Sequence, residues 1–378
     1  MNPAPVAPFQ AIAISRLAHR LKGEGRSIIH MEFGQPSTGA PPKAIATAHH
    51  WLDAEPGGYV FQAELCERIA RLYADRHGLS VDPERIILTC GASPALVLAL
   101  SALFSPGDRI AFVRPGYVAY RNTVIALDRV PVEIAADAST RFQLAASHID
   151  ALEAAPHGLI LASPANPTGT MIPASGLASI AAAARRRGTR IISDEIYHGL
   201  SYVEPAHSML EFDTDAVIIN SFSKYYSMAG WRLGWIVAPP GASDLLRRYI
   251  GNLFLTPPTL AQRAALVAMD EIDVLESYRD SYARNRAVLL DALPQMGLAR
   301  IAPPDGAFYI WADVSAFTND SMDFCRRLLI DTGVTIAPGV DFDPVDGHRF
   351  IRFSFAVSEA ETREAVERFG NWLGRQPR

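Results

Sequence analysis

The middle of the chain alternates short apolar runs with segments of helical pattern. The runs are RIILTC (85–90), RIAFVR (109–114), VPVEIA (130–135), GLILAS (158–163), TRIISD (189–194) and AVIINS (216–221). Helical patterns between them begin at Pro94, Tyr117 and Pro173. Such alternation predicts right-handed crossovers and a mainly parallel sheet with helices on both faces. We therefore expect a three-layer α/β domain, to which LGWIVA (233–238) adds a strand with its own short return.

The pattern changes beyond residue 255. Apolar positions at helical spacing continue to residue 293 and predict one long helix or two consecutive helices. They are followed by GAFYIWADV (306–314), GVTIAPG (333–339), HRFIRFSFA (348–356) and a helix from Ser358. With a helix near residues 10–22, these segments predict a smaller α+β domain. We expect residues 46–279 to form the large domain, and residues 1–45 and 280–378 the small one.

Composition and charge fit a globular protein. The chain has 378 residues, of which 49% are hydrophobic and 20% charged, enough for a large core and more than one domain. The net charge of -5 gives no reason to expect nucleic-acid binding. The basic run RRRGTR (185–190) follows an alanine-rich helical pattern and is interpreted as a solvated helix end.

The three cysteines, Cys66, Cys90 and Cys325, are widely spaced and form no CxxC pair. They predict reduced thiols and no zinc site, and no other metal site is expected. The N-terminal residues show no signal-peptide pattern, and no apolar run approaches the roughly 20 residues that span a bilayer. We expect a cytoplasmic protein that does not bind membranes.

Lys224 stands among serines, aromatics and glycines just beyond the apolar run that ends near Asn220. A lysine on an ordinary element keeps its ammonium in water. Beyond the end of a parallel strand, where ligands of open sheets bind, a partly dry lysine becomes an amine nucleophile with a lowered pKa. This segment alone leaves both interpretations open, because strand ends are also exposed loops.

Other predicted strand ends add polar groups. Gly91, Ala92 and Ser93 lie where a strand turns into a helix, and the free N–H groups of such a turn suit a phosphate. The same small residues also serve simply as a turn and cap. Asn166 follows another strand in a proline-bounded loop, and Asp194 ends a third, where it is a ligand group or an N-cap.

Several familiar motifs are missing from the sequence. It has no GxGxxG after its first strand, no GxxxxGK[ST], no HExxH and no GxSxG. Their absence disfavours dinucleotide and Walker-type sites, zinc peptidases and serine hydrolases. The groups present suit a ligand with a phosphate, a basic ring nitrogen and an aldehyde, which is the combination found in pyridoxal 5'-phosphate, PLP.

The motifs together resemble the class I and II aminotransferases of the PLP-dependent fold-type I superfamily. The resemblance rests on GAS (91–93), NPTG (166–169), SDEIY (193–197), SFSKYYSMAGWRLGW (221–235) and IRFSFA (351–356). It extends from about residue 30 to the C-terminus. It implies a PLP-dependent enzyme that moves an amino group between an α-amino acid and a 2-oxo acid by a ping-pong mechanism.

The resemblance also implies roles for single residues around the ring. Lys224 would form the Schiff base with PLP and then transfer a proton between the substrate α-carbon and the cofactor. Asp194 would keep the pyridine nitrogen protonated, and Asn166 and Tyr197 would hydrogen-bond the phenolic oxygen. Tyr117 would stack on the ring, although it could instead be a core residue.

Phosphate and substrate ligands are implied in the same way. The phosphate would be bound by Gly91, Ala92, Ser93, Ser221, Ser223 and Arg232. For Ser223 a purely structural hydroxyl is an equal alternative. The substrate would be bound by Gly34 and Asn166 and by Arg352, which would pair with the α-carboxylate. Because Arg352 lies in an alternating strand pattern, a surface ion pair is its alternative.

Tyr59 aligns with a family tyrosine that reaches the phosphate in the neighbouring subunit. This implies a homodimer with shared active sites. The sequence departs from the family here, since a glycine usual a few residues after the tyrosine is replaced by Ala63 or a neighbour. The local loop shape, and with it the role of Tyr59, is therefore in doubt.

Three rival functions share parts of this description. A carbon–sulfur β-lyase or a decarboxylase would use the same lysine and aspartate, because the cofactor supplies the chemistry. A PLP-binding effector domain of a transcription regulator would need a preceding DNA-binding domain, and only about 30 residues precede FGQPS (33–37). The sequence identifies no second arginine for a side-chain carboxylate of the substrate, which favours neutral or aromatic amino donors.

Overall fold

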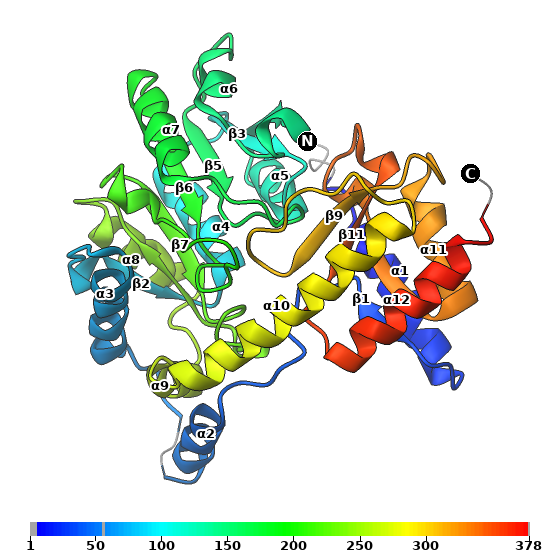
Figure 1. Cartoon of the computed structure of the whole chain (residues 1–378). Helices are drawn as coiled ribbons and strands as arrows, with labels where there is room; N and C mark the ends of the chain where they lie inside the picture. The colour runs from blue at the N-terminus through cyan, green and yellow to red at the C-terminus, as the bar shows by residue number, and fades with distance from the viewer. Residues whose placement is uncertain (1–5, 55–56, 377–378) are drawn as a thin grey trace.

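Two β-sheets organise the chain. The computed structural model describes residues 6–54 and 57–376, so parts of both expected domains, at residues 1–5, 55–56 and 377–378, lie outside it. Figure 1 shows the larger sheet in green and cyan on one side and the smaller sheet in blue and orange on the other. The domain boundaries expected near residues 45 and 279 stay a prediction.

The larger sheet is mainly parallel, as expected. In spatial order its strands are β2 (Ile86–Thr89), β8 (Gly234–Val237), β7 (Val217–Ser221), β6 (Arg190–Asp194), β5 (Gly158–Ala162), β3 (Arg109–Arg114) and β4 (Val130–Ala135). Only β8 runs antiparallel to its neighbours, which is the short return predicted for LGWIVA. The C-terminal ends of β5, β6 and β7 therefore meet at one edge, where parallel sheets bind ligands.

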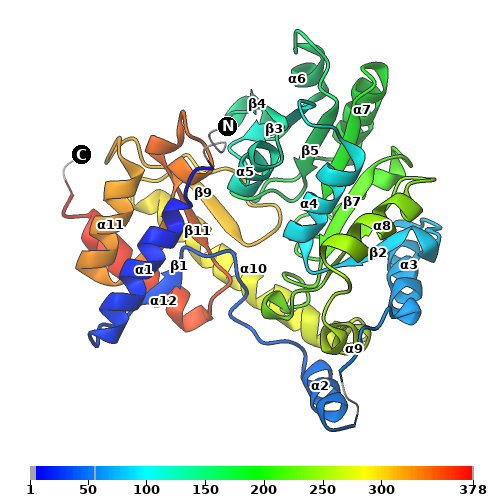
Figure 2. The same ribbon diagram turned by 180° about the vertical axis from the view of Figure 1, so that it is seen from behind.

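Helices cover both faces of this sheet because its strands are apolar on both sides. One face packs on α4 (Ala92–Leu103), α5 (Val118–Ala126) and α8 (Ser243–Leu253), and the other on α3 (Ala63–His77) and α7 (Ala174–Arg186). Along β6, Ile191 belongs to one core and Ile192 to the other, as the twofold period of a strand requires. Figure 2 shows α4, α5 and α8 in front of the sheet, which confirms the three layers.

The smaller sheet joins the two ends of the chain. Its order is β1 (Ile29–Met31), β10 (Val334–Pro338), β11 (Phe350–Ser354) and β9 (Tyr309–Asp313). Around it lie α1 (Gln10–Gly23), α11 (Ser321–Thr332) and α12 (Glu359–Leu373). Because β1 pairs with β10 in parallel, the N-terminal segment packs with the C-terminal one, as the sequence predicts.

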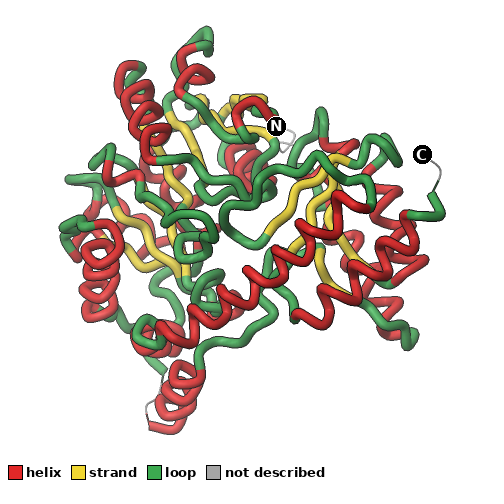
Figure 3. The backbone as a smooth tube through the Cα atoms, viewed as in Figure 1, coloured by secondary structure: helices red, strands yellow, loops and turns green. Residues whose placement is uncertain are grey.

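The remaining helices connect these parts. They are α2 (Pro42–Ala54), which packs on α9 (Thr259–Ala268), the short α6 (Ala146–Asp150), and α10 (Ile272–Gln295). Residues 256–293 thus form two helices, one of the two expected alternatives. Figures 1 and 3 show α10 running from α9 to the smaller sheet. Of the helices in the described ranges, none combines the length and hydrophobicity that a bilayer crossing requires.

Candidate active site

A cavity of about 510 Å³ lies between the C-terminal edge of the larger sheet and the smaller sheet. Most of the residues singled out in the sequence line it. They are Gly34, Ala92, Ser93, Tyr117, Asn166, Asp194, Tyr197, Ser223, Lys224, Arg232 and Arg352. Residues up to 318 positions apart in the chain therefore meet in one place.

Lys224 extends into the cavity from the loop after β7. Its Nζ donates a hydrogen bond to the backbone carbonyl of Gly34, at the start of the loop that follows β1. Burial lowers the pKa of this amine to about 8, and the positive charges of Arg352 and Arg232 act in the same direction against the carboxylate of Asp194. The solvated interpretation of this lysine is therefore wrong, and a neutral amine is accessible near physiological pH.

Asp194 ends β6 at the bottom of the cavity. Its Oδ2 accepts a hydrogen bond of 2.6 Å from the Tyr120 hydroxyl, and its Oδ1 accepts one of 3.2 Å from the Ile196 amide. The second bond shows that Asp194 does cap a turn, which is the N-cap role considered as its alternative. Burial raises the pKa of this carboxyl, so a cationic partner in the cavity would strongly favour its ionised form.

The N-terminus of α4 forms a cradle with Arg232. Gly91 has a φ of +102°, and a Cβ placed on it would lie 2.6 Å from Nη2 of Arg232. The arginine donates to the carbonyls of Ala229 at 2.9 Å and Cys90 at 3.2 Å, which holds its guanidinium beside the helix start. A guanidinium and the positive end of a helix dipole converge there, an arrangement that suits a phosphate.

The two serines before Lys224 differ in position. Ser221 Oγ donates to the Leu233 carbonyl at 2.9 Å and accepts from the Ser223 amide at 3.1 Å, and Ser221 is not among the lining residues. Ser223 lines the cavity, with its Oγ 2.8 Å from that of Ser221. Ser221 therefore shapes the loop, whereas Ser223 faces the space beside the cradle.

Arg352 projects from β11 with its guanidinium between two aromatic rings. Its Cζ lies 4.4 Å from the ring centre of Tyr309 and 4.6 Å from that of Phe342. Nη1 donates to Oδ1 of Asn166 at 2.8 Å, and Nη2 donates to the Glu32 carbonyl. Nε is buried without a partner in the described structure. Because Arg352 is only 4% exposed, the surface ion pair considered as its alternative is wrong.

Two further aromatic residues define the walls. Tyr197 Oη lies 2.7 Å from Tyr309 Oη, and this close pairing fixes both phenols in the cavity. A Cβ on Gly34 would lie 1.9 Å from Tyr309 Oη, so only glycine fits there. Tyr117 also lines the cavity and packs edge-on against Tyr120 at 5.5 Å and Phe9 at 6.2 Å between ring centres. Its ring is therefore both a packing element and a cavity wall.

Comparison with known proteins identifies the family to which the chain belongs. The family model described as aminotransferase class I and II matches residues 29–369. The chain belongs to this family. It is 43% identical to the valine–pyruvate aminotransferase of Mycobacterium tuberculosis over 99% of this chain and 98% of that one. It is 31% identical to the aspartate/prephenate aminotransferase of Thermus thermophilus over 97% of both chains.

Solved structures agree. A crystal structure of an aminotransferase from Mycobacterium tuberculosis superposes with a TM-score of 0.97 at 42% identity, covering 100% of this chain and 99% of that one. The resemblance to class I and II aminotransferases and the transaminase function that it implied are thus confirmed. Class I and II aminotransferases are PLP-dependent enzymes that use amino acids and 2-oxo acids.

The cavity of this aminotransferase fits that cofactor. At the cradle the Arg232 guanidinium lies so close to Gly91 that a Cβ there would clash with it, and Arg352 keeps a buried Nε without a partner among the described residues. The carboxyl of Asp194, which would pair with a cation, and the amine of Lys224, whose pKa is lowered, line the same cavity. These groups are complementary to the phosphate, the ring nitrogen and the aldehyde of the cofactor, and Arg352 is complementary to the carboxylate of a substrate.

Sequence reasoning missed several residues of this aminotransferase site. Tyr120, Tyr309 and Phe342 were not singled out, although the aromatic-rich GAFYIW run could have drawn attention to Tyr309. The Glu32 carbonyl has no sequence signal at all, since every residue carries one. Tyr59, in contrast, is 81% exposed and lies outside the cavity, so its proposed contact requires a second subunit.

Proposed function

We propose that this aminotransferase binds PLP in the 510 Å³ cavity and transfers an amino group from an α-amino acid to a 2-oxo acid in two half-reactions. The observation that carries the proposal is the meeting of Lys224, Asp194, Arg232 and Arg352 in that one cavity. When bound, the cofactor supplies an aldehyde and an electron-withdrawing ring.

Lys224 would first hold the cofactor covalently and, once displaced by the substrate amine, move a proton at the substrate α-carbon. A general base works best with a pKa near the working pH, and burial brings Lys224 to about 8. Asp194, supported by Tyr120, would hold a proton on the ring nitrogen. Tyr197 and Asn166 would contact the ring oxygen, and Tyr117 would lie against the ring face.

Arg232, with Gly91, Ala92, Ser93 and Ser223, would bind the phosphate, and Ser221 would support that loop. Arg352 would bind the substrate α-carboxylate through the N–H groups that Asn166 and Glu32 leave free, beside the Gly34 backbone. Holding the carboxylate fixes the α-carbon relative to Lys224, which lowers the entropic part of the barrier.

We further infer that the amino donor has a neutral side chain. Phe9, Ile12 and Phe33 line the cavity, and its cationic lining residues within the described structure are Lys224, Arg232 and Arg352, each with a role already proposed. A side-chain carboxylate would lose its hydration there without a partner. The valine–pyruvate relative supports a neutral donor, whereas the Thermus relative is named for aspartate, whose side chain is acidic, and for prephenate.

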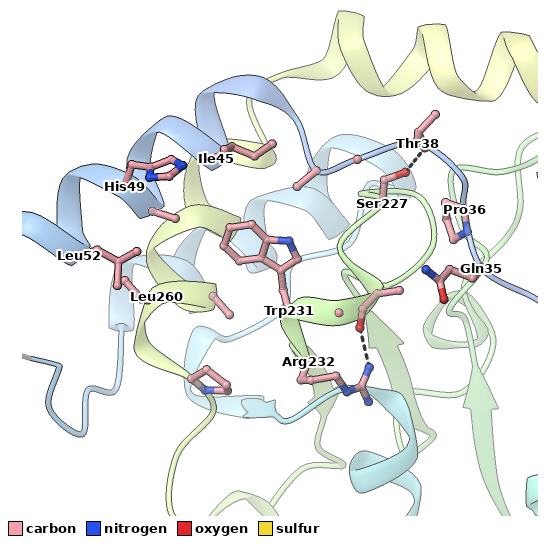
Figure 4. A pocket seen from close by; sticks show the side chains of 17 residues that line it. Gln35, Pro36, Thr38, Ile45, His49, Leu52, Ser227, Trp231, Arg232 and Leu260 are labelled. Carbon is pink, nitrogen blue, oxygen red and sulfur yellow. Dashed lines mark hydrogen bonds between the residues drawn. The ribbon is translucent and has the colours of Figure 1, made fainter. Parts of the chain in front are cut away.

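A second copy of the chain would complete the site. A pocket of about 640 Å³ opens between α2, the loop around Trp231 and α9, and Figure 4 shows Ile45, Leu52, Trp231 and Leu260 lining it. Arg232 lines this pocket as well as the cofactor cavity. An occupant of the pocket would therefore reach the phosphate cradle, and the exposed Tyr59 of a second copy suits that position.

Borohydride reduction of the PLP-loaded enzyme, followed by peptide mapping, tests the proposal. We expect the label on Lys224, and we expect Lys224→Ala to bind PLP without a borohydride-stable bond. Lys43→Ala, which removes a lysine outside the cavity, is the matched control. A label on another lysine would overturn the mechanism.

The reaction type is tested by supplying an amino acid alone. A transaminase should release one 2-oxo acid per site, stop, and resume when a 2-oxo acid acceptor is added. Continued turnover with release of ammonia or carbon dioxide would instead identify a lyase or a decarboxylase.

A further inference from the structure

We propose that the segment Asp341–Asp343 is a brace that sets the position of Arg352, which would bind the substrate carboxylate, relative to Tyr117, which would face the cofactor ring. Asp343 and Arg114 act as positioning residues. The inference rests on the proposed function, because it takes Arg352 and Tyr117 as the residues that contact substrate and ring. Neither Asp343 nor Arg114 lines the cavity.

The middle residue of the brace supports Arg352. The Phe342 ring centre lies 4.6 Å from the guanidinium carbon, and the ring itself packs edge-on against Trp311 at 5.8 Å between centres. A displacement of Phe342 would therefore remove one of the two aromatic faces that hold the guanidinium plane.

The same residue is tied to the ring-facing wall through the backbone. The Phe342 carbonyl accepts a hydrogen bond of 3.0 Å from the amide of Gly116, the residue immediately before Tyr117. A Cβ on Gly116 would lie 2.4 Å from the Val113 carbonyl, so the turn before Tyr117 is tight and a side chain does not fit at this position. The position of Phe342 is thus transmitted directly to Tyr117.

The two aspartates at the ends of the brace hold it in place, one through an ion pair and the other through backbone hydrogen bonds. Asp343, 4% exposed, accepts from Nη1 of Arg114 at 3.0 and 3.2 Å, and Arg114 ends strand β3 of the larger sheet. Asp341 accepts from the amides of Gln10 and Ala11, each at 2.7 Å, at the start of α1. The brace therefore joins the larger sheet, the smaller sheet and α1 at the edge of the cavity.

The ion pair is the part of the brace that can be tested without touching the cavity wall. Arg114 also contacts Asp346 at 3.2 Å, and Asp343 accepts from the amides of Val345 and Asp346 at 2.9 and 3.1 Å. Asn at position 343 keeps an acceptor for these amides and loses the charge that holds Arg114. Asp343→Asn should therefore loosen the link between the sheets and leave the local turn in place.

The test compares two half-reactions of the PLP-loaded enzyme, one with a neutral amino acid and one with a simple amine that has no carboxylate. Asp343→Asn should lower kcat/KM for the amino acid by about 10-fold to 100-fold, partly through kcat, because misplacement of about 1 Å has effects of that size. The rate with the amine should stay within about twofold. PLP content should be unchanged.

Glu133→Gln provides a matched control. Glu133 accepts two hydrogen bonds from Arg121, at 2.6 and 2.9 Å, and the side chains of Glu133 and Arg121 are 26% and 15% exposed. This pair joins β4 to α5, both of which belong to the part of the fold around the larger sheet. Loss of this pair should leave both half-reactions within about twofold. Arg114→Lys keeps the charge and tests the same link from the other sheet, should Asp343→Asn fold poorly.

A second measurement is independent of turnover. Calorimetric binding of 4-methylpentanoate, a carboxylate that cannot react, should weaken in Asp343→Asn and not in Glu133→Gln. The double variant Arg114→Lys/Asp343→Asn should be no worse than the poorer single variant, since both break one link.

Three results would overturn the brace: equal losses for the amine and the amino acid, unchanged amino-acid kinetics in both variants, or full additivity in the double variant. A wild-type enzyme that shows no half-reaction with any amino acid would instead overturn the proposed function.

Discussion

Lys224 gains its reactivity from where its side chain is buried. A pKa of about 8 instead of 10.5 raises the neutral fraction of the amine at pH 7 from well under 0.1% to about 10%. Only the neutral amine attacks an aldehyde. The rate at which the cofactor-free enzyme captures PLP should therefore rise with pH and level off above about pH 8. Stopped-flow absorbance from pH 6 to 10 measures this, and a rate still rising tenfold per pH unit at pH 9 would contradict the lowered pKa.

Arg352 offers a second test at the level of one side chain. Arg352→Lys keeps the positive charge but loses the planar fork that Asn166 and the Glu32 carbonyl orient. Losing one charge-assisted hydrogen bond costs about 1.5–3 kcal/mol, so kcat/KM for amino acids should fall by roughly one to two orders of magnitude. PLP binding should persist, because the phosphate is bound elsewhere. An equal loss for a simple amine would show that Arg352 supports the fold and not the substrate.

At the scale of elements, the junction of β2 with α4 leaves no room for a side chain at Gly91. Gly91→Ala would place a methyl group 2.6 Å from the Arg232 guanidinium in a backbone with φ +102°. PLP affinity should fall by about tenfold or more, because Arg232 must move from the cradle. Equilibrium dialysis measures it.

Gly107→Ala is the control for that change. Gly107 also has a positive φ, +86°, but a Cβ there meets no atom within 4 Å. It therefore shares the backbone strain without the clash. Equal loss of PLP affinity in both variants would mean that strain, and not the displacement of Arg232, explains the effect.

The elements that the sequence predicts well are those with one dominant signal. Strands such as β5 and β7 are continuous apolar runs because they are buried on both faces, and their polar ends bring Asn166 and Lys224 to one edge. The carbonyls that bind Lys224 and Arg352 come from Gly34 and Glu32, 190 and 320 positions away. The resemblance placed Gly34 beside the substrate, but both of these contacts are made by backbone carbonyls, which are the same in every residue, so no pattern of side chains could have predicted them.

At the scale of the whole molecule, the apolar surface around α2 predicts self-association. Leu52 is 62% exposed and lines the pocket that Arg232 also lines (Figure 4), and Phe61, which precedes α3, is 54% exposed. Leu52→Glu should convert a dimer to monomers in light scattering and lower the affinity for PLP, because the second copy would complete the cradle. Ile330→Glu, at a 38% exposed position on α11 outside this pocket, is the control. A monomeric wild-type enzyme with full activity would contradict shared sites.

The pairing of β1 with β10 has a consequence for how the protein is made. Ile29 pairs with Val334, so β1 leaves the ribosome about 300 residues before its partner strand exists. At typical synthesis rates of about 5–20 residues per second, that delay is roughly 15–60 s. All seven strands of the larger sheet, which end at Val237, are available well before then. The nascent chain can thus assemble the cradle and the lysine loop early, whereas Arg352, which would select carboxylates, emerges later with strand β11 of the smaller sheet.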